Sequence, residues 1–403
     1  MNEPKLRFKA DDGSEFPDWE EKKLNEIAVR VTRKNKDNVT DIPLTISSAD
    51  GLIDQRNFFN KVVASKDMSG YYLLKNGEFA YNKSYSKGYD FGSIKRLDLY
   101  DEGALSTLYI CFTLNKNENS DFYQKYFDSL SWYPELQKIC AEGARNHGLL
   151  NVPTNDFFQL KLCVPSSDKE QQKIADFLST VDAVIEKQKA TVSAWEERKK
   201  GVMQKLFSQE VRFKADDGSD FPEWEEKKLG DVFTERTERS KGGESLLSVT
   251  IAQGIIKQSE TDKRNIASEN KSNYKIVKKN DLAYNTMRMW QGAEGVSEYD
   301  GIVSPAYTVI TAVDGNNSYF FETMFKQTFM LQVFQRFSQG LTSDTWNLKF
   351  PAFSEIKCQV PCEDEQNKIV ECVAVLDEVI EKQKATLAAW EELKKGLLQQ
   401  MFV

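Results

Sequence analysis

The chain has 403 residues, of which 40% are hydrophobic and 12% aromatic, and its formal net charge at pH 7 is −8. That length predicts roughly two or three domains, and the aromatic content is sufficient for sizeable cores. The N-terminal stretch lacks the apolar centre of a signal peptide, and no apolar run is long enough to span a bilayer. A cytoplasmic protein without a membrane partner is therefore expected.

Cysteine and histidine usage argues against a metal site. No two of the 6 cysteines form a C-x-x-C pair, and His147 is the only histidine. A structural zinc site or a disulfide framework is therefore not expected, and the thiols are interpreted as small buried hydrophobes. The sequence also lacks a G-x-x-x-x-G-K-[ST] loop, a Gly-rich nucleotide turn and a triad, so no catalytic residue and no cofactor are predicted in this chain.

The acidic excess is unevenly distributed. Basic and acidic residues number 17 each in Asn25–Cys163 and 15 each in Gly230–Val360, so the whole deficit lies in the remaining segments. A neutral globule can still present a basic face to DNA, whereas acidic segments suit protein partners.

The first segment in the chain is a cap that recurs in the second half. RFKADDGSEFPDWEEKKL (Arg7–Leu24) and RFKADDGSDFPEWEEKKL (Arg212–Leu229) differ only by Asp/Glu exchanges. Pro17–Lys22 superficially resembles the P-D…E-x-K pattern of nucleases. Because its carboxylates are adjacent and cannot converge from separate strands, a structural turn is predicted instead.

Each cap leads into a variable stretch of mixed β-rich and helical pattern. Leu108–Leu114 and Ala306–Val313 are predicted as buried strands, and Ser120–Ser129 and Asn317–Phe337 as helical. Two α+β globules of roughly 135 residues are expected. The two stretches share only short matches, such as LLKNGEFAYN with IVKKNDLAYN and ISSADGLI with VTIAQGII.

Two loops in each variable stretch match in position and differ in content. They are Lys83–Gly92 with Gly143–Gly148, and Thr286–Gly295 with Gln339–Asn347. Basic, amide and aromatic side chains are the groups that read bases and hold phosphates. Solvated surface loops have the same composition, so that interpretation remains open for each residue. The candidate DNA-binding residues are Lys83, Tyr85, Lys87, Arg145, Asn146, His147, Arg288, Trp290, Gln291, Thr342, Ser343, Trp346 and Asn347.

Each variable stretch is followed by a long heptad-patterned helix. Apolar residues recur at alternating steps of four and three from Ile174 to Leu206, and again from Ile369 to Met401. A pseudo-two-fold axis crossing the pair would make the helices antiparallel. The alternative is that each helix packs only on its own domain. Polar residues recur within both seams, at Gln188, Gln383, Lys199 and Lys394.

The predicted fold is α+β, with two pseudo-symmetric α/β domains joined by two long helices in an antiparallel coiled coil. The predicted boundaries are 1–163 for the first cap and domain, 164–210 for the central helix, 211–360 for the second cap and domain, and 361–403 for the C-terminal helix. Because the order of units is circular, Val403 is expected to finish beside Arg7.

This arrangement resembles the specificity subunit of type I restriction–modification enzymes over essentially the whole chain. The motifs that carry the resemblance are the two caps, EQQKIADFLSTVD with EQNKIVECVAVLD, and the IEKQKAT…AWEE…KKG helices. The resemblance implies two target-recognition domains, each reading half of a bipartite double-stranded DNA site, and a helix pair that sets the spacer. An insertion in Ser208–Val211 is expected to lengthen that spacer.

The resemblance also implies protein partners. Two DNA-methyltransferase (modification) subunits would dock on the repeated segments, and up to two restriction subunits would join them. S-adenosylmethionine, ATP and Mg²⁺ would belong to those partners. The repeated AWEE motif supplies the candidate partner-binding residues, Trp195, Glu196, Trp390 and Glu391.

Two other classes of function remain alternatives. A self-contained modification–restriction enzyme would need methyl-donor and N-P-P-aromatic motifs, which the sequence lacks. A coiled-coil adaptor without sequence-specific DNA binding would show no binding to DNA with or without a modification subunit.

Overall fold

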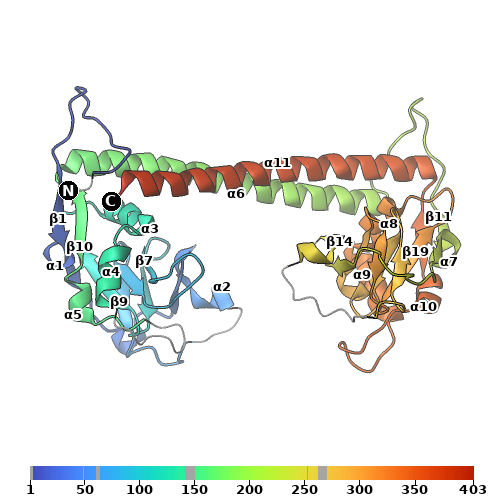
Figure 1. The fold of residues 1–403 in the computed structure, drawn as a ribbon, viewed down its shortest axis with the longest axis horizontal. Coiled ribbons are helices and arrows are strands. Elements are labelled where there is room, and N and C mark those ends of the chain that lie inside the picture. The colour runs from blue at the N-terminus through green and yellow to red at the C-terminus, as the bar shows by residue number, and fades with distance from the viewer. Residues whose placement is uncertain (1–2, 49, 60–63, 141–149, 252, 262–269) are drawn as a thin grey trace. The chain divides into compact units, whose positions relative to one another are not determined.

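The computed structural model describes residues 3–48, 50–59, 64–140, 150–251, 253–261 and 270–403. The chain forms two compact units (Figure 1). Unit 1 comprises Met1–Ala190 with Lys384–Val403, and unit 2 comprises Thr191–Gln383. Each unit therefore contains one cap, one variable stretch and part of both long helices.

Unit 1 is built on a four-stranded antiparallel sheet of order β2-β9-β6-β7. Two-stranded pairs β1-β10, β3-β4 and β5-β8 surround it. The strands are β1 Trp19–Lys23, β2 Ala28–Arg30, β3 Leu44–Ser47, β4 Gly51–Asp54, β5 Tyr72–Lys75, β6 Phe79–Asn82, β7 Ser93–Arg96, β8 Glu102–Leu105, β9 Ile110–Leu114 and β10 Lys161–Pro165. The helices are α1 Leu24–Ile27, η1 Lys36–Asn38, α2 Gln55–Phe59, α3 Ser120–Ser129, α4 Tyr133–Ile139 and α5 Thr154–Phe157.

Unit 2 repeats this topology, with a sheet of order β12-β19-β16-β17 and pairs β11-β20, β13-β14 and β15-β18. The strands are β11 Glu225–Lys228, β12 Phe233–Glu235, β13 Leu247–Thr250, β14 Gly254–Lys257, β15 Lys275–Val277, β16 Leu282–Asn285, β17 Glu294–Val296, β18 Gly301–Val303, β19 Tyr307–Ala312 and β20 Lys357–Val360. The helices are α7 Leu229–Val232, η2 Gln258–Glu260, η3 Met289–Gln291, α8 Ser318–Phe325, α9 Thr328–Phe337 and α10 Phe350–Ser354. The predicted homology of the two variable stretches is confirmed.

The predicted strand and helix segments are largely confirmed. Strands β9 and β19 lie within the predicted ranges, and α3 has the predicted bounds. The single helical stretch expected in Asn317–Phe337 is instead two helices, because Gln327 adopts an extended backbone (φ −73°, ψ 143°) that interrupts the helical hydrogen bonding.

The two long helices are α6, Asp168–Phe207, and α11, Glu363–Met401. In unit 1, Leu178 in the first part of α6 shares a core with Met401 at the end of α11. In unit 2, Leu206 at the end of α6 shares a core with Ile369 near the start of α11. The helices are therefore antiparallel, as predicted, and the alternative of two helices without mutual contact is wrong.

Lysines predicted in the helix seam form ion pairs between the long helices. Lys394 Nζ lies 2.6 Å from Asp182 Oδ1, and Lys199 Nζ lies 2.5 Å from Asp377 Oδ1. Asp182 also accepts a hydrogen bond from Lys125 of α3. Burial alone would raise the pKa of Asp182, but the hydrogen bonds from Lys125 and Lys394 outweigh burial and lower it. Specific polar pairs of this kind fix the register of two helices.

Each cap is joined to the start of a long helix by a buried glutamate. In unit 1 Arg7 Nε lies 2.8 Å from Glu170 Oε1, and Trp19 Nε1 donates to the same oxygen at 3.3 Å. Glu170 is completely buried. The hydrogen bond to Glu170 raises the pKa of Arg7.

The same arrangement recurs in unit 2, where Arg212 and Trp224 both donate to Glu365. We call the two sets the cap–helix ion pairs. They place the beginning of each long helix against its cap.

The turn predicted at Pro17–Lys22 is not present. Trp19–Lys23 forms strand β1 and pairs antiparallel with β10, with Glu20 opposite Val164. Trp19 is buried in this strand, whereas Glu20 and Glu21 are both exposed. The motif is therefore structural, although it is a strand and not a turn.

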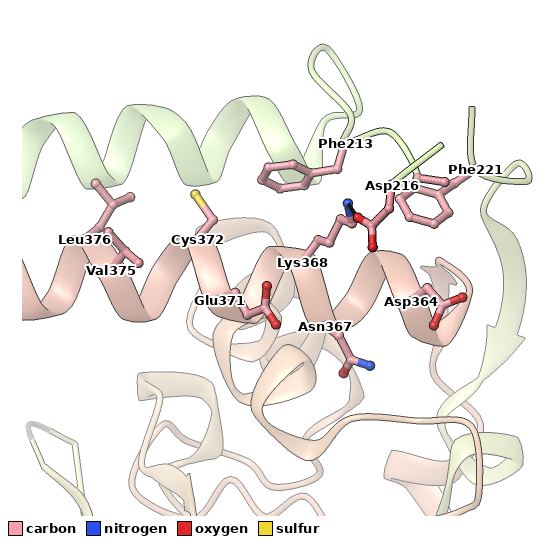
Figure 2. A pocket seen from close by; sticks show the side chains of 11 residues that line it. Phe213, Asp216, Phe221, Asp364, Asn367, Lys368, Glu371, Cys372, Val375 and Leu376 are labelled. Atoms are coloured by element: carbon pink, nitrogen blue, oxygen red, sulfur yellow. Dashed lines mark hydrogen bonds and ion pairs between the residues drawn. The ribbon is translucent and has the colours of Figure 1, made fainter. Parts of the chain in front are cut away.

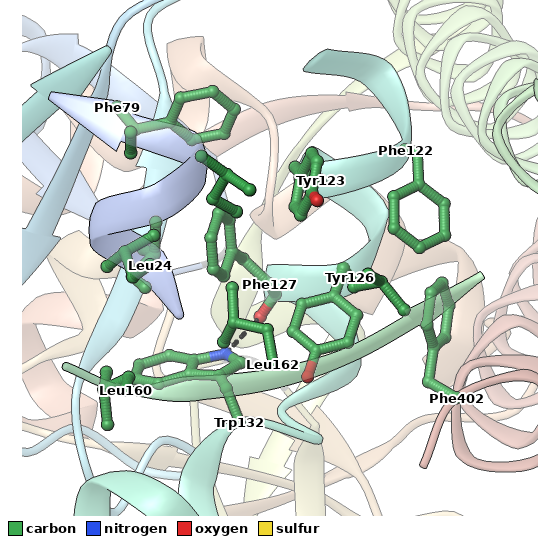
Figure 3. Packing of buried hydrophobic residues seen from close by; sticks show 14 of the residues in the cluster. Leu24, Phe79, Phe122, Tyr123, Tyr126, Phe127, Trp132, Leu160, Leu162 and Phe402 are labelled. Atoms are coloured by element: carbon green, nitrogen blue, oxygen red, sulfur yellow. Dashed lines mark hydrogen bonds between the residues drawn. The ribbon is translucent and has the colours of Figure 1, made fainter. Parts of the chain in front are cut away.

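The two ends of the chain meet in unit 1, as predicted. The Leu6 N–H donates to Gln400 O at 2.9 Å. The Phe402 ring packs against Trp19, Phe122 and Tyr126, with ring centroids 6.4, 5.9 and 5.7 Å away. Figure 3 shows Phe402 beside Phe122 and Tyr126. Figure 1 marks both ends beside β1.

In unit 2 the equivalent contacts lie within one uninterrupted stretch of the chain, at the junction between α6 and the second cap. The Val211 N–H donates to Lys205 O at 3.3 Å, and the Phe207 ring packs against Trp224 and Phe320. Ser208–Glu210 thus connects the end of a long helix to the next cap in unit 2. In unit 1 the corresponding helix end and cap belong to opposite ends of the chain and are not connected.

We expect Arg7→Met to destabilise unit 1 by about 3–5 kcal/mol, because Glu170 would keep a buried charge without its partner. Hydrogen exchange of the full chain in denaturant would measure this separately for each unit. Arg212→Met is the matched variant and should act on unit 2 alone. Adding Glu170→Leu to Arg7→Met should recover much of the loss, and no recovery would contradict the assignment.

A circular permutant should also fold. Ser-Gln-Glu, copied from Ser208–Glu210, would join Phe402 to Leu6, and new ends would be opened between Phe207 and Val211. We expect its stability to lie within about 1 kcal/mol of the parent, because the new loop closes a gap that is already short. Thermal unfolding would show this, and a permutant that does not fold would contradict the equivalence of the two junctions.

Candidate nucleic-acid interface

The two loops predicted to bind DNA in unit 2 lie side by side. One contains η3 and follows β16, and the other follows α9. The Trp290 and Trp346 rings meet edge to face with centroids 5.1 Å apart. The Leu348 N–H donates to Thr286 O at 2.8 Å. The structure therefore brings Arg288, Trp290, Gln291, Thr342, Ser343, Trp346 and Asn347 onto one neighbouring pair of loops.

The second of these loops has a fixed backbone. Gln339 and Asn347 exchange two backbone hydrogen bonds across its base. Gly340 has φ +146°, and a Cβ there would lie 2.6 Å from Thr345 O. Thr342 and Thr345 bond to each other within the loop. Only glycine fits at position 340, and the constrained loop leaves Leu341 wholly exposed.

The described residues of unit 1 keep one of these contacts. The Leu150 N–H donates to Lys83 O at 2.8 Å, which is the counterpart of the Leu348–Thr286 hydrogen bond. Tyr85 and Lys87 are exposed beside Lys83. The predicted residues Arg145, Asn146 and His147 lie outside the described residues.

The described basic residues Lys83, Lys87 and Arg288 of these loops are free of ion pairs. Among the residues that the structure describes, Arg33, Arg96 and Arg236 are each paired with carboxylates, whereas Lys83, Lys87 and Arg288 have no carboxylate within ion-pair distance. Burial lowers the pKa of Lys83, and the nearby charge of Arg30 lowers it further. These three side chains can bind phosphates or base edges without first breaking an internal pair.

A third segment, which the sequence did not indicate as part of a site, lies against these loops. Ser48, in the β3–β4 connection, is hydrogen-bonded to Ser86 at 2.9 Å. In unit 2 the β13–β14 hairpin approaches β17 so closely that a Cβ on Gly295 would lie 2.8 Å from the Gly254 Cα. The signal in the sequence was the ISSADGLI and VTIAQGII match, whose central residues differ at each turn.

Glu294 belongs to the divergent Thr286–Gly295 stretch but is not available to DNA. It is completely buried, and Lys326 Nζ lies 3.8 Å from its carboxylate. Burial raises the pKa of Glu294 well above its usual value despite that lysine. Glu294 therefore belongs to the buried interior of unit 2 and not to the surface proposed for DNA.

The candidate partner-binding residues lie on the long helices. Trp195 and Trp390 are half-buried, and Glu196 and Glu391 are exposed. The Arg198 guanidinium lies 5.3 Å from the centre of the Trp195 ring. Their contact with another protein stays a prediction.

No cluster of metal-ligating side chains occurs in the described parts of the chain. In the same parts, no helix combines the length and apolarity that crossing a bilayer requires.

A family model of the type I restriction modification DNA specificity domain matches residues 17–192 and again residues 222–389. The chain belongs to the type I restriction modification DNA specificity family. It carries two copies of the specificity domain, and each copy includes the loop pair of one unit. A comparison of the sequence with curated proteins found no match.

Solved structures share the fold of this specificity-family chain. One is the S subunit of a type I restriction-modification system from M. genitalium, with 14% identity, a TM-score of 0.53, and coverage of 100% of this chain and 99% of that chain. Another comes from work on the complex assembly and conformational transition of the type I R-M system, with 16% identity, a TM-score of 0.55, and coverage of 96% and 98%. At these identities the likeness concerns the fold alone.

We expect Gly340→Ala to weaken DNA binding by the specificity-family chain in complex with its partners about tenfold or more, because the loop that carries Thr342 and Trp346 must rearrange. Gly315→Ala is the matched control. Gly315 also has a positive φ, but its Cβ would meet no atom closer than 3.9 Å. Fluorescence anisotropy with target DNA would compare the two variants, and equal effects would contradict a role for the loop.

Proposed function

We propose that the chain is the DNA-recognition subunit of a type I restriction–modification complex, in which each unit reads one half of a bipartite site. The observation that carries the proposal is the pairing of two divergent loops in unit 2, with the matching Leu150–Lys83 hydrogen bond in unit 1, within a framework of near-identical caps and helices. A framework that repeats while its loops diverge suits two readers of different sequences. The adaptor without DNA binding has no observation in its favour.

The side chains of the loops suit direct reading of bases. An arginine such as Arg288 can pair with guanine through two hydrogen bonds, and amides such as Gln291 and Asn347 can pair with adenine. Lys83 and Lys87 suit phosphate contacts, which position the protein and carry no sequence information.

The catalytic work falls to partner proteins in this proposal. Two modification subunits bind the repeated helices and caps and use S-adenosylmethionine. Up to two restriction subunits supply ATP- and Mg²⁺-dependent activity. The acidic excess of the repeated segments supports protein docking there. Methyl transfer or DNA cleavage by the purified chain alone would contradict this division.

Arg288→Ala should relax the bases read in the second half-site and leave the first unchanged. Loss of a bidentate arginine–guanine contact costs about 1–3 kcal/mol, or roughly 5- to 150-fold in discrimination. Methylation-sensitive sequencing of DNA treated with the assembled complex would measure both half-sites. The control is Lys83→Ala, which removes a phosphate contact and should weaken binding without relaxing the bases read in either half-site. A change in the opposite half-site by either variant would contradict independent reading.

The helix pair is proposed to set the spacer between half-sites. An insertion in Ser208–Val211 would lengthen only a loop, because α6 has already ended at Phe207, whose ring is packed on Trp224. A better test inserts seven residues after Ala190 and seven after Gln383, which lengthens each helix by about 10 Å and keeps the heptad register.

We expect that double insertion to lengthen the spacer by about three base pairs, at about 3.4 Å each, without changing the bases read. The same sequencing assay measures spacer length. Insertion into Ser208–Val211 is the control and should have little effect. An unchanged spacer in the double insertion would contradict the proposal that the helices act as a ruler.

A further inference from the structure

The second cap and helix α11 enclose a groove of about 750 Å³ in unit 2. Figure 2 shows Phe213 and Phe221 of the cap on one side, and the α11 side chains Lys368, Cys372 and Leu376 on the other. The sulfur of Cys372 points from α11 toward the side on which the Phe213 ring lies. The groove is lined by both apolar and charged side chains.

The framework around this groove is the same in the two units. Lys368 Nζ lies 2.6 Å from Asp216 Oδ1 and 5.9 Å from the centre of the Phe221 ring. The counterparts in unit 1 are Lys173 with Asp11, also at 2.6 Å, and Lys173 with the Phe16 ring, also at 5.9 Å. A difference between the two grooves therefore arises from the side chains that line them.

One such difference removes an aromatic ring. The IEKQKAT helices align Phe177 of α6 with Cys372 of α11. In unit 1 the Phe177 ring packs edge to face against Phe8, with centroids 5.5 Å apart. In unit 2 the counterpart of Phe8 is Phe213, and Cys372 offers it only a thiol. Unit 2 therefore has a gap the size of a phenyl ring beside an apolar wall, where unit 1 supplies its own ring.

A second difference changes the charge of the groove. Asp364 lines it in unit 2, where the aligned residue of unit 1 is Lys169. With Asp216, Lys368 and Glu371, the charged lining residues of unit 2 sum to −2, whereas their counterparts in unit 1 sum to zero. An occupant that fits both features carries an aromatic side chain and positive charge.

We propose that this groove binds one aromatic side chain from a basic segment of a modification subunit, so that the two modification subunits bind the chain with unequal affinity. The inference rests on the proposed function, which supplies the identity of the partner. Two identical modification subunits would find an open groove in unit 2, whereas in unit 1 the Phe177 ring already occupies the corresponding position. The subunit at unit 2 is therefore the more tightly bound.

Calorimetric titration of the full chain with purified modification subunit, supported by native mass spectrometry, tests this. The wild-type chain should bind two copies in two resolved steps. Cys372→Phe places in unit 2 the ring that unit 1 tolerates at Phe177, and should weaken the tighter step about tenfold. Ala374→Phe is the matched control. It adds a ring at an exposed position of the same helix that does not line the groove, and should bind like the wild type.

Two further variants separate shape from charge. Phe177→Cys should open the groove in unit 1 and tighten the weaker step. Asp364→Lys, which copies Lys169, should weaken the tighter step, and raising the salt concentration should reduce that effect. Circular dichroism and thermal unfolding would verify that each variant is folded.

These experiments separate a failure of the unequal docking from a failure of the proposed function. Two equal steps in the wild type, or unchanged affinity in folded Cys372→Phe, would overturn the proposal of unequal docking. If Cys372→Phe did not fold, unchanged affinity in Asp364→Lys would overturn it instead. Failure of the wild-type chain to bind any modification subunit would contradict the proposed function itself.

Discussion

The architecture depends on one buried interaction that occurs twice, the cap–helix ion pair. Glu170 and Glu365 are nearly or completely removed from water, and each is stabilised by an arginine and a tryptophan N–H from its cap. A buried carboxylate is costly without such partners. The cap therefore has to be present before the first turn of the long helix can be buried. This requirement explains why both caps keep their arginine and tryptophan and both helix starts keep their glutamate.

The variable stretches are under a different constraint. Their cores need only apolar residues of suitable size, such as Phe122 in α3 and its counterpart Phe320 in α8. Both units consequently reach the same strand order with little sequence in common. The loop after β16 contributes Met289 to the core of unit 2, and the loop after α9 is fixed at Gly340, whereas exposed side chains such as Tyr85 and Leu341 have no place in the core. Sequence change can therefore accumulate in the exposed parts of the loops proposed to bind DNA without disturbing the framework.

Much of this arrangement could be predicted from the sequence, because its signals are local or repeated. The heptads gave both long helices, and the apolar pattern of Ser120–Ser129 gave α3. Strand β1 was missed because Trp19 becomes a strand residue only through pairing with β10, far along the chain. Ser48 was missed for a similar reason, since only the folded sheet places it beside Ser86. The open groove beside Cys372 required knowing which cap residue its counterpart, Phe177, contacts.

The discontinuity of unit 1 has a consequence for synthesis of the chain. Unit 2 is one continuous segment, whereas unit 1 needs Lys384–Val403 from the opposite end. As the chain leaves the ribosome, the first unit to emerge is thus the last to be completed. Until Phe402 arrives, the aromatic surface around Trp19 and Tyr126 has no cover, and exposed apolar surface of this kind promotes aggregation. Translation rate and chaperone supply should therefore matter more to the first half of this protein than to the second.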